Sequence, residues 1–548
     1  MFRRVLLVSI LLIPAWLQAP APEAQAVVST PVLKWQKGGC FSSWCQTGWY
    51  GSPAVADLDA DNKPEVIWGS YDVVAVNGED GTLQWRAASG NRVWGGVSVV
   101  DLTGDGSLEV VAGRSGDSLT VYNAAGGTLW SRNPFGAGEL RTQAVADLDN
   151  DGRYEVIVGR AGSGGDEQIQ VYDASGNVRS GFRAPHAGAP GYGWGLYNQN
   201  LAIGDITGDG LKDLIVPTDT HYITGLDAFG NQLPVHTRYG AGKIWRQVGV
   251  HVSDAVDLRG YANCGTEHRP NFANSSPAIG DLDGNGTLEV VVIGNVYNCA
   301  ASPYASLYEA PFIFNADRSR WAASGFDWTV IATPPAPAAP RSEDYNVIES
   351  AEPNAVLADL DGDGKREILY PSYDGRLHAF WLDKTEKHSW PYELDVAGQL
   401  RFASEPTVVD LDGDNLAEVI VTTWTRKGSN TGGQLLILSY QGTLLAAVDL
   451  PRAASSTSGG ALGAPTVANI DADADLEVVV GTINNGLVAY DLPNTAQARV
   501  IWGTGRGGLT RTALAADTFT CTHSSGGVPG VIPNGAFLLF IPTMRRFC

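Results

Sequence analysis

Cationic residues are scarce in this chain of 548 residues. Its 37 lysines and arginines are outnumbered by 59 aspartates and glutamates, which gives a formal net charge of −22. Such an excess of negative charge repels phosphate groups and argues against a protein that neutralises nucleic acid or anionic lipid. The hydrophobic fraction of 44% is ordinary for a folded protein, so wholesale disorder is excluded as well.

The sequence also lacks an apolar run long enough to cross a membrane. A spanning helix needs ~20 residues, whereas the N-terminal run Val5–Ile13 is interrupted at Pro14. Two arginines precede this run, and Ala24-Gln25-Ala26 places small residues where a signal peptidase cuts. The pattern predicts a signal peptide over residues 1–26, cleaved after Ala26, and a secreted or cell-surface protein without a transmembrane segment.

Cysteine is rare, and no C-x-x-C pair occurs, so neither a thiol redox motif nor a zinc ribbon is indicated. The chain has six cysteines, and an even number in an exported protein indicates disulfides. Proximity in the sequence favours Cys40–Cys45, Cys264–Cys299 and Cys521–Cys548, although other pairings of the six stay open.

No segment shows sustained helical periodicity, whereas the 66 glycines indicate many tight turns between short strands. One cassette recurs eight times: a short apolar segment, a nine-residue acidic loop and a second apolar run. Further strand-like segments such as Ser118–Tyr122 lie between the copies, which gives about four strands per repeat. The acidic loops begin at Asp57, Asp101, Asp147, Asp205, Asp281, Asp359, Asp410 and Asn469.

Radial repetition of four-stranded sheets produces a β-propeller, in which each blade buries its faces against its neighbours. The repeats therefore predict an all-β protein with eight four-stranded blades over residues 27–511. Residues 512–548 are expected to form a C-terminal tail of uncertain structure that a disulfide could tie down. Seven blades remain the alternative, because the longer spacings could hide an irregular blade. Either Val32–Trp35 or Arg499–Trp502 could supply the strand that closes the ring.

The acidic loops predict cation sites. Oxygen-bearing side chains recur at positions 1, 3, 5 and 9 of each loop, and the resulting repulsion between carboxylates is relieved by a hard divalent cation. Position 6 is Gly or Asn in all loops but the last, which suits a turn with positive φ. We therefore expect up to eight structural Ca²⁺ ions. The expected ligands are Asp57, Asp59, Asp61, Glu65; Asp101, Thr103, Asp105, Glu109; Asp147, Asp149, Asp151, Glu155; Asp205, Thr207, Asp209, Asp213; Asp281, Asp283, Asn285, Glu289; Asp359, Asp361, Asp363, Glu367; Asp410, Asp412, Asp414, Glu418; and Asn469, Asp471, Asp473, Glu477.

Other calcium loops do not fit these residues. An EF-hand needs a glutamate at position 12, where every copy instead has a residue of the following strand, such as Val158. The stacked GGxGxD motifs of RTX proteins are absent. No G-x-S-x-G or H-E-x-x-H occurs either, and most conspicuous carboxylates belong to the loops, so no catalytic residue is assigned.

The cassette, in phrases such as GSPAVADLD, SSPAIGDLD and GAPTVANID, resembles the FG-GAP/VCBS repeat over Pro31–Arg511. That repeat builds the N-terminal β-propeller of integrin α-subunits and many bacterial secreted proteins. The resemblance implies a calcium-binding propeller in which each acidic loop joins the first two strands of a blade. Nothing in the chain resembles the integrin leg domains, so integrin signalling is not implied.

Two functions remain compatible with such a propeller. The first is a non-catalytic binding or adhesion module for an extracellular glycan or protein. The alternative is a polysaccharide lyase of the eight-bladed rhamnogalacturonan lyase type, since similar propellers occur there.

Two long repeat periods carry insertions, and loops on a rigid scaffold are where binding function usually lies. Aromatic, cationic and histidine side chains gather there, a combination that suits sugar rings and carboxylated glycans. A capping loop stapled by Cys264–Cys299 is the structural alternative. The candidate ligand surface comprises Tyr222, Arg238, Trp245, Arg246, His251, Arg259, His268 and Arg269.

Overall fold

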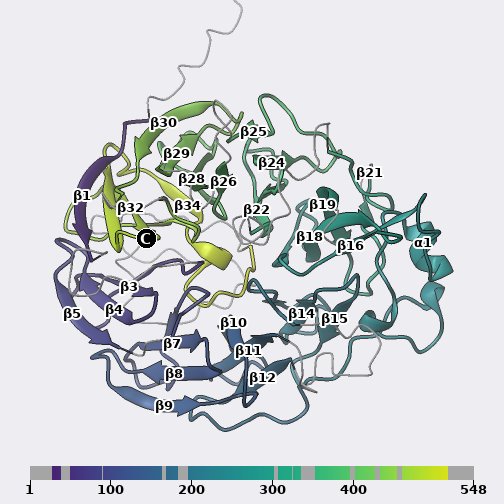
Figure 1. Cartoon of the computed structure of the whole chain (residues 1–548), viewed down its shortest axis with the longest axis horizontal. Coiled ribbons are helices and arrows are strands. Elements are labelled where there is room, and N and C mark those ends of the chain that lie inside the picture. The colour runs from purple at the N-terminus through teal and green to yellow at the C-terminus, as the bar shows by residue number, and fades with distance from the viewer. Residues whose placement is uncertain are drawn as a thin grey trace, which may run out of the picture.

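Eight small antiparallel sheets surround a central axis and form an eight-bladed β-propeller (Figure 1). The computed structural model describes residues 28–38, 50–88, 91–162, 168–182, 195–301, 306–323, 325–334, 352–394, 401–425, 432–452 and 459–515. The predicted fold class is confirmed, with eight blades rather than seven. The signal peptide predicted for residues 1–26 lies outside the described residues.

The first four blades follow one another directly along the chain. The third and fourth blades have three strands, and an isolated bridge (Tyr172 to Val178, Leu226 to Gln232) marks the place of the fourth strand. The strands are β2 (Ala54–Ala56), β3 (Glu65–Gly69), β4 (Val73–Asn77) and β5 (Leu83–Ala87); β6 (Ser98–Val100), β7 (Glu109–Arg114), β8 (Ser118–Tyr122) and β9 (Thr128–Arg132); β10 (Glu139–Ala146), β11 (Glu155–Ala161) and β12 (Ile169–Tyr172); and β13 (Ala202–Gly204), β14 (Asp213–Pro217) and β15 (Ile223–Leu226).

Of the last four blades, the fifth and the seventh carry additional strands. In the fifth blade β16 (His268–Asn271) pairs with β18, and the small hairpin β20 (Ala322–Ala323) and β21 (Phe326–Asp327) follows. In the seventh blade β26 (Arg401–Ala403) and β34 (Arg499–Trp502) are added. The blade strands are β17 (Ala278–Gly280), β18 (Glu289–Asn298) and β19 (Ser306–Phe314); β22 (Val356–Ala358), β23 (Glu367–Pro371), β24 (Arg376–Phe380) and β25 (Tyr392–Glu393); β27 (Thr407–Asp410), β28 (Glu418–Thr425), β29 (Gln434–Leu438) and β30 (Leu444–Asp449); and β31 (Thr466–Ala468), β32 (Leu476–Gly481), β33 (Leu487–Leu492) and β1 (Val32–Lys37).

Burial explains the composition of these strands. The second strands, such as β3 and β7, are buried along their whole length because both faces pack on neighbouring blades. They are accordingly rich in Val and Ile rather than alternating with polar residues. The outer strands β5 and β9 are largely exposed, with Trp85 and Trp130 half-buried.

Tryptophan indoles join neighbouring blades. The indole of Trp85 donates to the carbonyl of Ala124 in the next blade (2.8 Å), and that of Trp130 donates to Ala174 (2.9 Å). Trp35, Trp328 and Trp390 make equivalent bonds to the following blades, to Gly78, Leu382 and Tyr440. The tryptophans of the repeat are therefore packing residues that also satisfy a turn carbonyl.

The N-terminal strand closes the ring. β1 pairs with β33 and becomes the outer strand of the eighth blade, which resolves the ambiguity left by the sequence in favour of Val32–Trp35. Its competitor β34 pairs instead with β27, the innermost strand of the seventh blade. Ring closure therefore joins residues more than 400 positions apart, Val32 opposite Asp491.

The segment after β34 runs along the innermost strands at the centre of the ring. Carbonyls of Leu509, Thr510, Thr512 and Ala513 accept hydrogen bonds from Val99, Val145, Ile203 and Ile279 of four successive blades. Residues 512–515 thus belong to the centre of the propeller, whereas the sequence placed the start of a tail at 512. Within the described residues, no helix is long and apolar enough to cross a membrane.

Candidate metal centres in the acidic loops

Each acidic loop joins the first and second strands of its blade. The position-9 residue lies at the start of the second strand and opposite the end of the first strand, as Glu65 does with Ala56 and Glu367 with Ala358. In the eighth blade β32 begins one residue earlier, at Leu476. Because the same connection recurs in every blade, all eight loops lie on one face of the ring. This is the arrangement that the repeat implied.

Backbone hydrogen bonds hold the loops in a common shape. In the second loop, the Asp101 carboxylate accepts from the amides of Gly104, Asp105 and Gly106 (2.7–3.1 Å). The position-9 carboxylate accepts from the amide at position 2, from Leu102 to Glu109 at 2.8 Å. Position 6 has positive φ wherever it is Gly or Asn, as at Gly364 (80°) and Asn62 (67°), as predicted.

Carboxylates converge within the loops. In at least five of them, one oxygen from each of three acidic residues lies within 4.8 Å of the others. Both carboxylate oxygens of Asp283 are buried and, among the described residues, accept no hydrogen bond. A buried carboxylate without a donor is costly, and a cation offsets that cost. The convergent groups are Asp57, Asp59, Asp61; Asp147, Asp149, Glu155; Asp281, Asp283, Glu289; Asp359, Asp361, Glu367; and Asp410, Asp412, Glu418.

The donor set suits calcium. All donors are oxygens, and Ca²⁺ accepts 6–8 of them in flexible geometry, so main-chain carbonyls and water can complete the shell. The second and fourth loops have Thr at position 3 and therefore offer one carboxylate fewer to a cation. In the fourth loop the hydroxyl of Thr207 donates to Asp213 (3.0 Å), and the hydroxyl oxygen keeps its lone pairs for a metal ion.

Burial perturbs the glutamates that end the loops. Desolvation, reinforced by neighbouring loop aspartates, raises the pKa of Glu367 to about 9 and that of Glu418 to about 8. The same cause raises the pKa of Glu289 to about 7. In the absence of a cation, these side chains therefore hold protons that isolated glutamates lose.

We expect the metal-free protein to lose stability as the pH rises from about 5 to about 9. Over this window the folded glutamates bind more protons than the unfolded chain, whose glutamates titrate near 4.5. Stability must then fall with rising pH. Calcium should remove this dependence, because it binds the deprotonated loops. Thermal denaturation in EDTA and in calcium at several pH values tests this; a melting temperature in EDTA that rises from pH ~5 to ~8 would contradict it.

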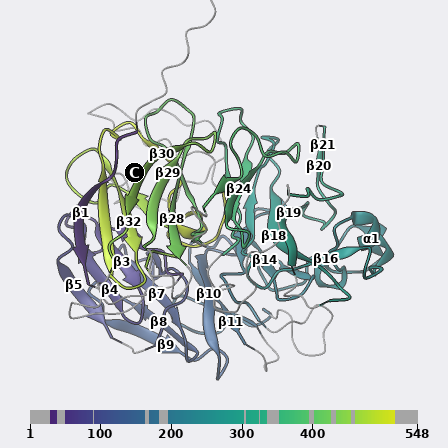
Figure 2. The same ribbon diagram turned by 45° about the horizontal axis from the view of Figure 1, so that its top comes forward.

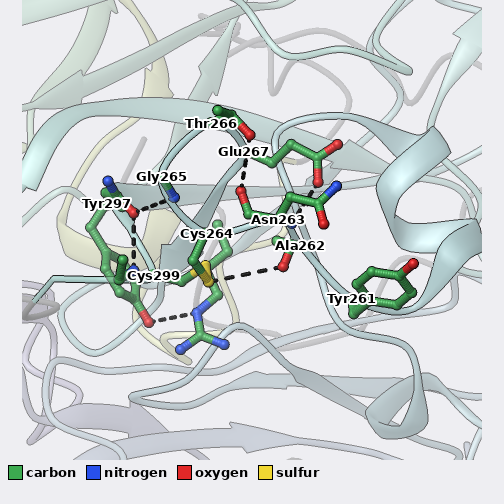
Figure 3. Close-up of a disulfide and its surroundings, with 12 residues drawn as sticks. Tyr261, Ala262, Asn263, Cys264, Gly265, Thr266, Glu267, Tyr297 and Cys299 are labelled. Carbon is green, nitrogen blue, oxygen red and sulfur yellow. Dashed lines mark hydrogen bonds between the residues drawn. A yellow bond between two sulfur atoms is a disulfide. The ribbon is translucent and has the colours of Figure 1, made fainter.

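The insertion of the candidate ligand surface lies at the outer rim of the ring, where Figures 1 and 2 both place α1. It contains η1 (Thr237–Tyr239), η2 (Trp245–Gln247) and α1 (Asp254–Arg259), short helical turns that the sequence did not predict. The Cys264–Cys299 disulfide is confirmed, with Cα atoms 5.0 Å apart (Figure 3). The pairs Cys40–Cys45 and Cys521–Cys548 lie outside the described residues.

The structure removes two residues from the candidate ligand surface. Trp245 is fully buried and donates from its indole to the carbonyl of Ala316 (3.1 Å), so it is the interblade tryptophan of the fourth blade. His251 is also buried and contacts Asp257 through Nδ1 (3.0 Å). The sequence could not reveal this, because the insertion separates Trp245 from its strand and hides the repeat.

Most of the remaining candidates have partners within the insertion. Arg238 forms an ion pair with Asp254, and Arg259 forms one with Glu267. Arg269 donates to the hydroxyl of Tyr297 (2.8 Å), and the ring of Tyr222 lies 4.2 Å from that of His221. Arg246 and His268 are half-buried. The charges of Arg238 and Arg259 are thus neutralised, as in the alternative of a stapled cap.

Replacement of Trp245 by Ala is expected to destabilise the protein by about 3–5 kcal/mol, the usual cost of truncating a buried tryptophan. Thermal denaturation measures the effect, with Arg246→Ala as the half-buried neighbouring control. A melting temperature equal to that of the control would show that Trp245 does not join the blades.

Comparison with known proteins supports the repeat and the fold. A family model described as FG-GAP-like repeat matches residues 147–216 and 359–421, which include four of the acidic loops. Sqt1 of Saccharomyces cerevisiae is similar in structure, with 10% identity, a TM-score of 0.50 and coverage of 84% of this chain and 100% of that chain. Rhamnogalacturonan lyase YesW has 16% identity, a TM-score of 0.45 and coverage of 84% and 75%. BamB of Moraxella catarrhalis has 15% identity, a TM-score of 0.39 and coverage of 80% and 92%. No curated protein matches the sequence.

Proposed function

We propose that this FG-GAP-repeat β-propeller is a secreted, calcium-stabilised binding module that holds an extracellular glycan or protein without catalysing a reaction on it. In the sixth loop, Asp359, Asp361, Asp363 and Glu367 would hold the ion. Bound calcium neutralises carboxylates that otherwise repel one another. The calcium-bound loops would then stiffen the ring, and the ligand would bind to a surface outside these loops.

Export is supported by the disulfide. Disulfides persist in oxidising compartments and are rare in the cytosol. The Cys264–Cys299 bond joins the insertion to the end of β18, so it stiffens the rim of the fifth blade. This agrees with the signal peptide that the sequence predicts.

Tyr261 is the single observation that carries the binding proposal. Its side chain is 59% exposed, and the guanidinium of Arg259 lies 4.7 Å from its ring centroid. It precedes the disulfide by three residues (Figure 3), so little entropy is lost when it contacts a ligand. An exposed aromatic ring suits stacking against the face of a sugar ring.

A glycan array probed with the full chain tests the proposal. Tyr261→Ala should reduce binding strongly while the melting temperature stays unchanged. Phe229→Ala is the matched control, because Phe229 is similarly exposed (52%) but lies in a turn of the fourth blade. Equal binding by both variants would place recognition elsewhere. Release of unsaturated sugars from rhamnogalacturonan, followed by ultraviolet absorbance, would instead favour the lyase alternative.

A further inference from the structure

One register position in the outer strands faces the acidic loops. In the eighth blade the pairing of β1 with β33 shifts between Leu33 and Trp35, so Lys34 lies at a bulge. The pairing of β4 with β5 shifts in the same way around Gln84, and that of β8 with β9 around Leu129. A bulge redirects a side chain, and here it is aimed at the loop. Gln84 confirms the direction, because its amide donates to Glu65 at position 9 of the first loop (2.7 Å).

Lys34 places an ammonium group inside the eighth loop. Its Nζ donates to Asp471 at position 3 and lies 3.3 Å from Glu477 at position 9. The side chain of Lys34 is only 18% exposed, and that of Glu477 is fully buried. The ammonium group therefore bridges two of the oxygens that a metal ion would need.

Arg179 does the same in the third loop. The bridge between Tyr172 and Val178 gives Arg179 the register of the bulge residue. Its guanidinium lies 2.9 Å from Asp149 at position 3 and 2.7 Å from Glu155 at position 9. Two cations from different blades thus contact the same pair of loop positions.

The eighth loop has also departed from the common shape. Asn469 replaces the leading aspartate, and its side-chain NH2 group, which donates to the carbonyl of Asp473 (2.7 Å), stands where an aspartate has its second carboxylate oxygen. Its Oδ1 accepts from the amide of Asp471 (3.1 Å). Ala474, at position 6, is not among the described residues with positive φ. These changes remove one negative charge and the turn that the other loops share.

We propose that the bulge residue of each outer strand decides whether its acidic loop takes a metal ion, and that Lys34 and Arg179 are tethered counter-ions that exclude calcium from the eighth and third loops. The proposal rests on the calcium role proposed above. It makes closure of the ring by β1 independent of calcium, whereas the loops whose bulge residue is Leu or Gln depend on it. Lys34 lies in β1, the strand that completes the propeller, and it neutralises carboxylates of the eighth loop.

The number of calcium ions per chain, measured by native mass spectrometry and calorimetric titration, tests the proposal. Arg179→Leu reproduces the Leu129 of the second blade at a loop that keeps all four carboxylates, and it should bind one more ion than the unmodified chain. Its melting temperature should also respond more to calcium. Gln84→Leu is the matched control, because it removes a neutral bulge residue and should leave the count unchanged.

The eighth loop provides the second arm. Asn469→Asp should gain no ion while Lys34 is present, whereas Lys34→Leu combined with Asn469→Asp should gain one. An unchanged count in Arg179→Leu, or its failure to fold in calcium, overturns the proposal. If the unmodified chain binds no calcium at all, the calcium role itself fails; if it binds calcium but Arg179→Leu gains none, only the counter-ion proposal fails.

Discussion

Chelation with EDTA is expected to lower the melting temperature of this protein by about 10 °C or more. A site in equilibrium with free ligand at 100 times its Kd stabilises the folded state by about 2.7 kcal/mol. Globular domains have a total stability of only ~5–15 kcal/mol, so the loss of several such sites is a large fraction of it. Removal of the ions also restores the repulsion among carboxylates such as Asp359, Asp361 and Glu367, which lie within 4.8 Å of one another.

Differential scanning calorimetry in EDTA, followed by back-titration with calcium and with magnesium, measures this effect. Calcium should restore the melting temperature, whereas magnesium should restore it less, because it demands a tighter octahedron. Unfolding that is insensitive to chelation would show that the acidic loops are solvated turns without a structural ion.

Replacement of Asp257 by Asn is expected to destabilise the protein by about 3–5 kcal/mol, the usual cost of breaking a buried ion pair. Asp257 lies in α1 and is buried between two guanidinium groups, 2.9 Å from Arg318 and 3.1 Å from Arg320. Burial alone would raise its pKa, but Arg320 and Arg318 hold the pKa of Asp257 at about 2. Both arginine side chains are themselves fully buried, so the substitution leaves two uncompensated charges between α1 and the turn that follows β19.

Urea denaturation measures the loss, with Glu267→Gln as the control. Glu267 also pairs with an arginine of the insertion, Arg259, but this pair is partly exposed and should contribute little. Equal stability of the two variants would show that the insertion does not depend on its buried charges.

The propeller could be predicted because its repeat is local. Each loop places its oxygens and its Gly or Asn at fixed offsets, so a nine-residue window contains the cassette, and the positive φ at Gly364 and Asn62 follows from it. Ring closure could not be decided in this way. Val32–Trp35 and Arg499–Trp502 are both short apolar segments that end in Trp, and only the pairing of β1 with β33 distinguishes them.

The burial of Trp245 and His251 could not be predicted, because burial in an insertion leaves no periodic signal. Trp245 is separated from its repeat, and the partners of Arg238 and Arg259 lie on turns that composition does not pair. The central segment was missed for a related reason. Its backbone bonds go to several blades in turn, and its buried Arg506 and Arg511 resemble surface residues in the sequence.

Lys34 illustrates the largest gap between sequence and structure. Its loop partner Asp471 is 437 residues away. The cassette alone shows only that the eighth loop lacks the leading aspartate. The structure adds the cation that occupies the loop. The contact between Arg179 and the third loop is invisible to the cassette in the same way, although that loop keeps all its carboxylates.

The calcium content of the purified full-length protein tests whether the acidic loops hold structural ions. The protein is dialysed against calcium-free buffer without chelator, and its metal is measured by mass spectrometry. Six ions per chain are expected, one for each of the eight loops except those that Lys34 and Arg179 occupy. Fewer than about four ions, or a metal other than calcium, would contradict this expectation, because carboxylate loops of this number and burial would then fold without the cation they are shaped to hold.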